Sequence, residues 1–207
     1  MELFDFTNQQ LLTFGGALAA AVILITLIVW IVRRLKYSSP DRRIEKIIKV
    51  ESQEYAKDIV LSDGMYDFLF VDYLVLMKGN IVALDVHHLE GYIFGGEQIE
   101  QWAQVKNGKS FKFKNPLYRV RLVQQQIKQL VKEADIEARV IFGSDSSFPK
   151  GIPEGVLRFE TLRDDLNTLD KNDYLAESMS KTWEEIMTIA KQHKQRYQQE
   201  SKNIKIK

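Results

Sequence analysis

Hydrophobic residues follow three different patterns along the 207 residues of the chain. Residues 11–32 read "LLTFGGALAAAVILITLIVWIV" and carry no charge. Residues 68–87 contain two nearly continuous apolar runs, "FLFVDYLVL" and "NIVALDVH", on either side of a Lys-Gly turn. In residues 115–134 and 173–199 the apolar positions recur at helical spacing. These patterns predict, in turn, a helix of membrane-spanning length, strands buried on both faces, and amphipathic helices.

The first apolar run is long enough to be a membrane anchor, because about 20 residues of helix cross a bilayer core about 30 Å thick. The preceding residues include Glu2 and Asp5 but no Lys or Arg, so they lack the basic start of a cleaved signal peptide, the alternative interpretation. The basic segment "RRLK" begins at Arg33, directly after the run. Because positive residues stay on the cytoplasmic side, we expect a single-pass protein of the cytoplasmic (inner) membrane with its N-terminus outside.

The rest of the chain alternates predicted strands and helices. Helices are expected at 42–56, 115–134, 160–169 and 173–199, and strands at 57–67, 68–76, 80–87, 91–96, 110–114, 137–143 and 154–159. This order predicts an α/β domain in which helices flank one central mixed sheet. The predicted organisation is an N-terminal segment 1–36, a linker 37–43, a domain 44–165, and a C-terminal helix with a loose tail, 166–207.

The amino-acid composition limits the kinds of functional site that the chain can form. The chain has no cysteine, which excludes disulfides and thiolate metal sites, and its net charge of +1 gives no overall attraction to nucleic acid. Between residues 103 and 121, however, aromatic residues interleave with six basic residues and no acid. The basic residues are Lys106, Lys109, Lys112, Lys114, Arg119 and Arg121. Such a patch is typical of a nucleic-acid-binding surface, or of an edge strand whose lysines prevent pairing with other chains.

Each of the two central apolar runs contains one aspartate. If the turn between them is the two-residue loop Lys78-Gly79, Asp72 stands directly opposite Asp85; a loop one residue longer makes them diagonal neighbours. His87 would share their face of the sheet. Two opposed, buried carboxylates are unfavourable unless something offsets their charge, and Mg²⁺ or Mn²⁺ suits oxygen ligands. Alternatively, one aspartate emerges at a strand end, where water or backbone amides solvate it.

This part of the chain resembles the nuclease-related domain (NERD) family, a branch of the PD-(D/E)xK nuclease superfamily. The likeness covers residues 58–155 and is carried by "FVDYLVL", "NIVALDVH", "EGYIFGG", "QW", "FKNP" and "VIFGSDSSFPKG". The resemblance implies a restriction-endonuclease-like fold and DNase chemistry that depends on Mg²⁺ or Mn²⁺. By that resemblance, Asp72 and Asp85 bind the metal, and His87 stands where the lysine that activates water is expected.

Three departures from the family pattern point to a weak or degenerate phosphodiesterase site. His87 replaces the expected lysine, Arg119 replaces a frequent glutamine, and a glutamate of the first helix is missing unless Glu51 or Glu54 supplies it. We therefore expect a membrane-tethered, nucleic-acid-binding protein that retains metal binding and has no small-molecule cofactor. The alternative is a non-catalytic membrane-anchored scaffold, which an exposed apolar stripe on the 173–199 helix would favour by offering a protein partner a docking surface.

Overall fold

The structure is a computed structural model that describes residues 22–28, 40–62, 68–131, 135–170 and 176–205. The chain divides into two units at Arg43–Ile44, and both sheets belong to the second unit. In the first unit, residues 22–28 form a helix. Within the described ranges, no helix is both long and apolar enough to cross a membrane. Most of the predicted span at 11–32 lies outside those ranges, so the anchor stays a prediction.

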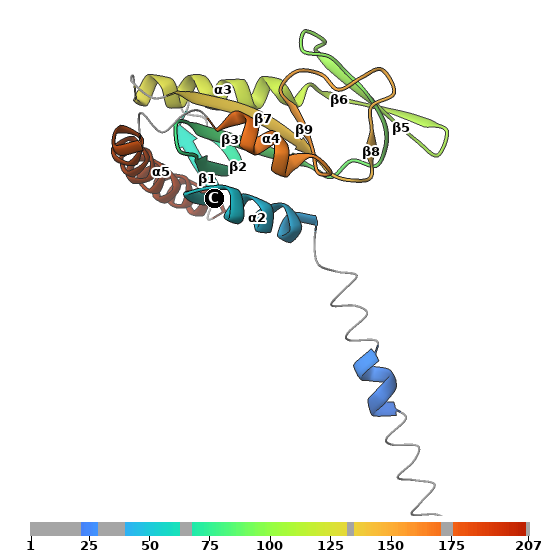
Figure 1. Cartoon of the computed structure of the whole chain (residues 1–207). Helices are drawn as coiled ribbons and strands as arrows, with labels where there is room; N and C mark the ends of the chain where they lie inside the picture. Colours follow the sequence, from blue (N-terminus) through green and yellow to red (C-terminus); the bar gives the residue numbers. More distant parts are fainter. Residues whose placement is uncertain (1–21, 29–39, 63–67, 132–134, 171–175, 206–207) are drawn as a thin grey trace, which may run out of the picture. The chain divides into compact units, whose positions relative to one another are not determined.

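The second unit is built on two sheets (Figure 1). The larger has the strand order β1-β2-β3-β7-β9, in which β1, β2 and β3 are antiparallel and β3, β7 and β9 are parallel. Its strands are β1 (Glu54–Ser62), β2 (Phe68–Leu76), β3 (Ile81–His87), β7 (Ile136–Phe142) and β9 (Val156–Arg158). The predicted mixed sheet flanked by helices is thus confirmed.

The smaller sheet has the order β6-β5-β4-β8 and was not predicted as a separate layer. Its strands are β4 (Gly91–Phe94), β5 (Gln101–Lys106), β6 (Lys109–Lys114) and β8 (Ser146–Ser147). The prediction of one sheet was therefore wrong. The sequence did not predict strand β5, because "QWAQVK" mixes polar and apolar residues without a clear two-residue period.

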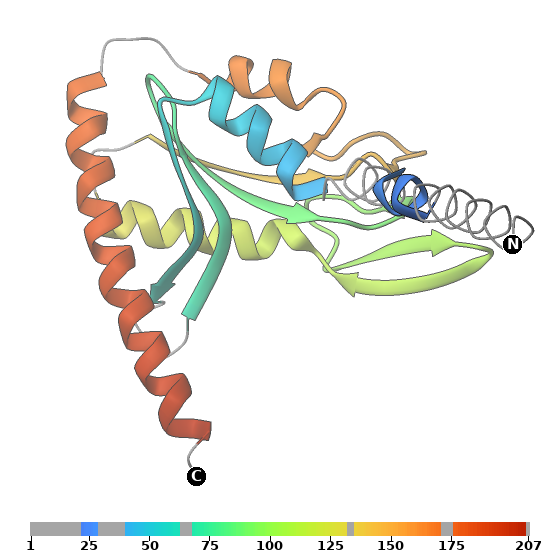
Figure 2. The same cartoon turned by 90° about the horizontal axis from the view of Figure 1, so that it is seen from below.

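Helices cover both faces of the larger sheet (Figures 1 and 2). The helices are α2 (Pro40–Glu51), α3 (Pro116–Leu130), α4 (Leu162–Leu169) and α5 (Ala176–Lys205). One core packs side chains of α3 and α5 against the sheet, and the other packs α2 and α4 against its opposite face. Helix α2 ends at Glu51, five residues before the predicted end, because β1 pairs with β2 from Glu54 onward.

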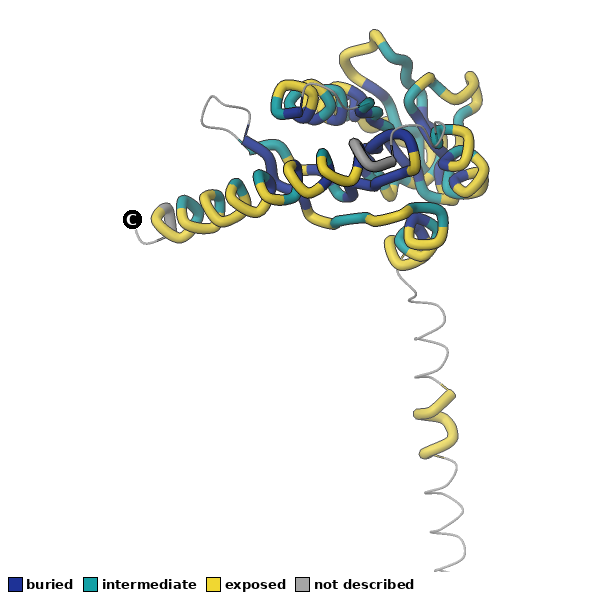
Figure 3. The backbone as a smooth tube through the Cα atoms, turned by 60° about the vertical axis from the view of Figure 1, so that its left-hand side comes forward, coloured by how far each residue is buried: buried dark blue, intermediate teal, exposed yellow. Residues whose placement is uncertain are grey.

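The first half of α5 packs against β1, where Met179, Trp183, Ile186 and Ala190 are buried. Figure 3 shows the change along this helix from buried residues to exposed ones toward its C-terminal end. The Trp183 indole donates a hydrogen bond to Glu54 at 2.8 Å. The apolar stripe is therefore used inside the domain, and the condition that would favour a scaffold is not met. The helix also continues through 201–205, which was expected to be loose.

Candidate active site

The β2–β3 hairpin sets the geometry of the aspartate pair. The Met77 amide donates to the Asn80 carbonyl at 2.9 Å, and Tyr73 pairs with Leu84. The loop is therefore the shorter of the two alternatives, and its register places Asp72 opposite Asp85 on the face that packs against α3. The predicted two-residue loop and its register are confirmed.

Strands β2 and β3 separate just beyond the Tyr73–Leu84 pair, so Asp72 and Asp85 stand where the ladder ends. The ladder ends at Tyr73–Leu84, and β1 and β2 curve away from β3 (Figure 2). The Val86 amide donates instead to Asp72 Oδ2 at 2.7 Å. A side-chain carboxylate thus takes the place of a carbonyl in the sheet, which satisfies a backbone group that separation would leave unpaired.

Asp85 is 1% exposed and lies between two basic side chains. Arg119, in the first turn of α3, donates from Nε to Asp85 Oδ2 at 3.2 Å and from Nη2 to Oδ1. His87 Nε2 lies 3.1 Å from the same Oδ2. The guanidinium thus binds both carboxylate oxygens, the bidentate geometry that Arg favours. Arg119 thus engages one of the two carboxylates that were predicted to bind a metal ion.

The two carboxylates have opposite electrostatic environments. Burial tends to raise the pKa of Asp85, but the hydrogen bonds with His87 and Arg119 outweigh it and hold this pKa below its usual range. Burial raises the pKa of Asp72, and the nearby charge of Asp85 raises it further, although the Val86 amide opposes the shift. Asp85 is therefore the stably ionised member of the pair, and Asp72 carries the unfavourable charge.

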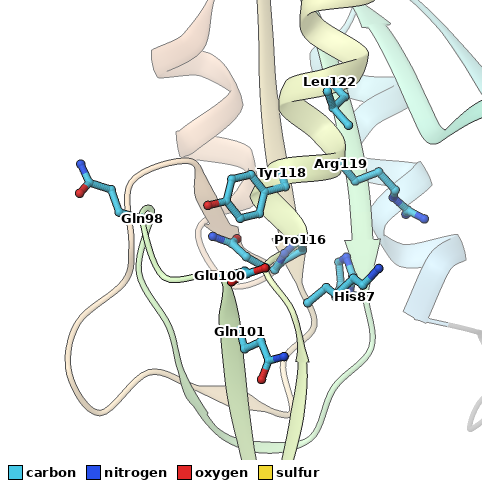
Figure 4. A pocket seen from close by; sticks show the side chains of 10 residues that line it. His87, Gln98, Glu100, Gln101, Pro116, Tyr118, Arg119 and Leu122 are labelled. Atoms are coloured by element: carbon cyan, nitrogen blue, oxygen red, sulfur yellow. The ribbon is translucent and has the colours of Figure 1, made fainter. Parts of the chain in front are cut away.

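His87 and Arg119 open onto a pocket of about 800 Å³ at the N-terminal end of α3. Figure 4 shows Arg119 and His87 on one side of it, with Tyr118, Glu100 and Gln101 across from them. The remaining lining residues are Gln98, Lys114, Asn115, Pro116 and Leu122. Asp72 instead lines a smaller pocket of about 290 Å³ between the β1–β2 hairpin and α5. His87 and Asp72, two of the three predicted catalytic residues, thus face two different cavities.

As arranged, these residues do not fit a resident Mg²⁺. Arg119 holds both oxygens of Asp85, and in the described ranges no three His, Asp or Glu side chains are grouped as metal ligands. The two glutamates proposed to complete the site are engaged elsewhere. Glu51 pairs with Arg163 at 2.8 Å, and Glu54 accepts the hydrogen bond from Trp183.

The predicted basic patch separates into groups with different partners. Arg119 binds Asp85, Arg121 pairs with Glu97 at 3.3 Å, and Lys106 pairs with Glu90. Three lysines remain on exposed positions of β6, namely Lys109, Lys112 and Lys114. Strand β6 forms one edge of the smaller sheet, as the edge-strand alternative requires. That position does not distinguish protection of the edge from ligand binding.

Asn115 positions the site, although the sequence indicated only a helix start there. Its buried amide donates to the carbonyls of Gly96, Glu97 and Ile99 at 3.2, 3.1 and 2.9 Å. Its Oδ1 accepts the hydrogen bond from the Leu117 amide at 2.9 Å, which caps α3. Asn115 therefore fixes both the loop at 96–99 and the first turn of α3, the turn that carries Arg119.

Together, fold and site define an α/β domain in which two opposed carboxylates on a β-hairpin lie beside a basic pocket. Residues 41–143 match the family model of the nuclease-related domain, NERD. The matched range includes Asp72, Asp85, His87 and the whole basic patch, in agreement with the resemblance in sequence. No curated protein shows detectable similarity to the chain.

Proposed function

We propose that this protein binds nucleic acid through its nuclease-related domain, and that its Mg²⁺-dependent phosphodiesterase site is weak or inactive. The observation that carries the proposal is the guanidinium of Arg119, which is bidentate to Asp85 and also lines the 800 Å³ pocket. One cation thereby neutralises the buried acid and faces the space where a substrate would lie.

The pocket suits a phosphate group. Lys114 and Arg119 line it, and so do residues at the start of α3, a helix without an acidic residue in its first turn. Helix N-termini favour anions, and arginine binds phosphate through paired hydrogen bonds. Because the Arg119 side chain is 50% exposed, a phosphate can approach it from solvent. Glu100 is the acidic residue of the lining and Lys114 balances its charge, while Arg119 offsets the charge of the buried Asp85.

The same contacts argue against fast hydrolysis. A divalent cation needs free carboxylate oxygens, and those of Asp85 are both hydrogen-bonded. A side chain that activates water must also be able to reach it. His87 is held 3.1 Å from Asp85 and its ring stacks on Phe142, with ring centroids 5.5 Å apart. A hydrolytic step would therefore require Arg119 to leave Asp85 first.

We further propose that the domain is tethered to the cytoplasmic membrane through residues 11–32, with the domain on the cytoplasmic side. The support is the uncharged length of that run and the basic residues that follow it. A reporter that functions in the cytoplasm, fused after Lys207, should be active. Activity there of a reporter that functions only outside the cytoplasm would contradict this topology.

Nucleic-acid binding and cleavage can be measured separately on the purified full-length protein. Binding of labelled DNA and RNA should be detectable in EDTA, where cleavage cannot interfere. Addition of Mg²⁺ or Mn²⁺ should produce slow cleavage or none. Brisk Mg²⁺-dependent cleavage that Asp72→Asn abolishes would refute a weak site, and absence of binding to any nucleic acid would refute the proposal as a whole.

The role of Arg119 as the resident cation has its own test. Arg119→Gln should free the Asp85 oxygens, so Mn²⁺ should bind the variant at least about tenfold more tightly than it binds the wild type, a difference of about 1.4 kcal/mol. Electron paramagnetic resonance of added Mn²⁺ measures metal binding directly, whether or not the protein cleaves nucleic acid. Lys128→Gln, an exposed change on the same helix, is the matched control. Equal Mn²⁺ affinities in wild type and Arg119→Gln would contradict this role.

A further inference from the structure

Strand β6 directs two of its lysines, Lys112 and Lys114, and its two aromatic residues to opposite faces of the smaller sheet. Lys112 and Lys114 alternate with Phe111 and Phe113, so the two pairs cannot share a face. Phe113 packs edge-on against the buried ring of Trp102, with centroids 6.1 Å apart. The phenylalanines therefore belong to the inner face, which points toward the core, and Lys112 and Lys114 belong to the outer face.

The outer face also carries aromatic residues that come from β4. Lys112 of β6 pairs with Ala103 of β5, and Ala103 in turn pairs with Phe94 of β4, so Phe94 lies on the same face as Lys112. Tyr92 lies two residues before Phe94 and therefore shares this face. Tyr92 is 55% exposed. The amino group of Lys150 lies 5.9 Å from the centre of the Phe94 ring, a cation–π distance. No acidic residue occurs among the paired residues of this face in β4, β5 and β6.

Protection of a sheet edge would account for the exposed Lys112 and Lys114 on β6, but not for the exposed Tyr92 on β4. Strand β4 is an interior strand that pairs with both β5 and β8. An exposed aromatic ring there has no edge to protect. Within the described part of the chain, Lys112 and Lys114 have no ion-pair partner, so their charges are available to a ligand.

The outer face continues into the pocket of the candidate active site. Gln101 pairs with Lys114 at the end of the β5–β6 ladder, and both residues also line that pocket beside Arg119 and His87 (Figure 4). A ligand lying across the sheet would thus reach the Arg119–Asp85 pair without leaving the basic surface.

We propose that the outer face of the smaller sheet binds single-stranded nucleic acid and leads it into the pocket. Tyr92 stacks on a base, and Lys112, Lys114 and Lys150 bind backbone phosphates. The inference rests on the proposed nucleic-acid binding and adds the kind of strand and its path. Open sheet faces with aromatic and basic residues bind single strands because unpaired bases can expose their ring faces. In a duplex those ring faces are covered by neighbouring bases, and Tyr92 would find no partner.

The test compares strands and faces on the full-length protein in EDTA by fluorescence anisotropy. The probes are a 20-nucleotide oligo(dT), the corresponding oligo(U), and a duplex of the same length. At least one single strand should bind about tenfold more tightly than the duplex. Tyr92→Ala should weaken that binding about five- to hundredfold, the range expected for loss of one stacked base. Phe111→Ala, a change of an equally exposed aromatic residue on the inner face, should leave it unchanged.

The salt dependence of single-strand binding tests whether the lysines contact phosphates. The logarithm of the single-strand binding constant falls with the logarithm of salt concentration by about 0.7 for each phosphate contact. Lys112→Ala should therefore reduce the slope by about that amount, whereas Lys128→Ala on α3 should not change it. Equal effects of Tyr92→Ala and Phe111→Ala, or equal affinity for the duplex, would overturn the path across the sheet while nucleic-acid binding survives. No binding by the wild type would overturn both proposals.

Discussion

The two sheets of this domain differ in where their charged side chains lie and in what balances those charges. The larger sheet is covered by helices on both faces, and its buried carboxylate, Asp85, has its charge balanced inside the protein by Arg119. The smaller sheet is covered on its inner face, where Ile93 and Trp102 are buried, while its outer face presents Lys112 to solvent.

The difference shows what each surface can do. A buried ion must have a partner within the fold, because its desolvation is otherwise too costly. The charges of the larger sheet are therefore mostly committed to the protein itself, and a ligand must compete for them. On the outer face of the smaller sheet, Lys112 and Lys114 are in no ion pair within the described residues, so binding to them requires no ion pair to break. The structure thus separates a buried carboxylate with an internal partner from exposed lysines, and the following changes test that separation.

Removal of the ring that joins the two sheets should have the largest effect. Trp102 of β5 is fully buried and stacks against Phe142 of β7, with centroids 6.0 Å apart. Trp102→Ala should lower the free energy of unfolding by about 3–5 kcal/mol, as expected for a large core aromatic residue. Urea denaturation followed by circular dichroism should still show one transition. Two separate transitions would mean that the sheets fold independently.

Asp85→Asn should destabilise the protein by about 2 kcal/mol, because hydrogen bonds to charged groups contribute about 1.5–3 kcal/mol. The pH dependence follows from the lowered pKa of Asp85 in the folded state. The stabilisation by its carboxylate is complete above the unfolded pKa of about 4 and is lost as pH falls through the lower folded value. Chemical denaturation at several pH values should therefore show the wild type and variant converging in acid. A difference that does not change with pH would contradict the ion pair.

Asp72→Asn should have the opposite sign and a smaller size. The pKa of Asp72 is raised by burial and by Asp85, so its carboxylate destabilises the folded state at neutral pH. The variant should be more stable by about 0.5–1 kcal/mol at pH 7, since an asparagine oxygen can still accept from the Val86 amide. The advantage should shrink as pH falls and the wild-type carboxyl becomes protonated. Thermal unfolding at pH 7 and at about pH 4 would reveal it, and a less stable variant at pH 7 would refute it.

The smallest effect is expected on the smaller sheet. Lys106 pairs with Glu90, but their side chains are 41% and 56% exposed. Exposed ion pairs contribute about 0–1 kcal/mol, so Lys106→Ala should change the free energy of unfolding by at most about 0.5 kcal/mol. A loss as large as that of Asp85→Asn would show that this surface also depends on internal charge pairs.

Local features of the sequence were sufficient to predict the aspartate pair. A two-residue turn fixes the register of a hairpin, and the register fixes which residues oppose each other. Asp72, Asp85 and His87 could therefore be placed on one face from their spacing alone. The roles of these residues in metal binding and catalysis stay predictions.

Distant contacts could not be predicted in the same way. Arg119 lies 34 residues from Asp85 in the chain, and no periodicity indicates that the first turn of α3 meets β3. The basic patch was contiguous in sequence, yet the alternation of β6 places Lys112 and Phe111 on opposite faces. The aromatic residue that shares the lysine face, Tyr92, comes from another strand, which only the pairing of β4 with β5 reveals.

The position of α5 has a consequence for how the chain folds as it is synthesised. The Ser62 amide, near the end of β1, donates to His193 Nδ1 at 3.0 Å, and Lys194 donates to the Asp58 carbonyl at 3.2 Å. These contacts join segments that lie 131 and 136 residues apart. Strand β1 therefore leaves the ribosome long before the helix that covers it. Until then the edge of β1 that does not pair with β2 is open to other nascent chains, the period in which an edge strand is most prone to aggregate.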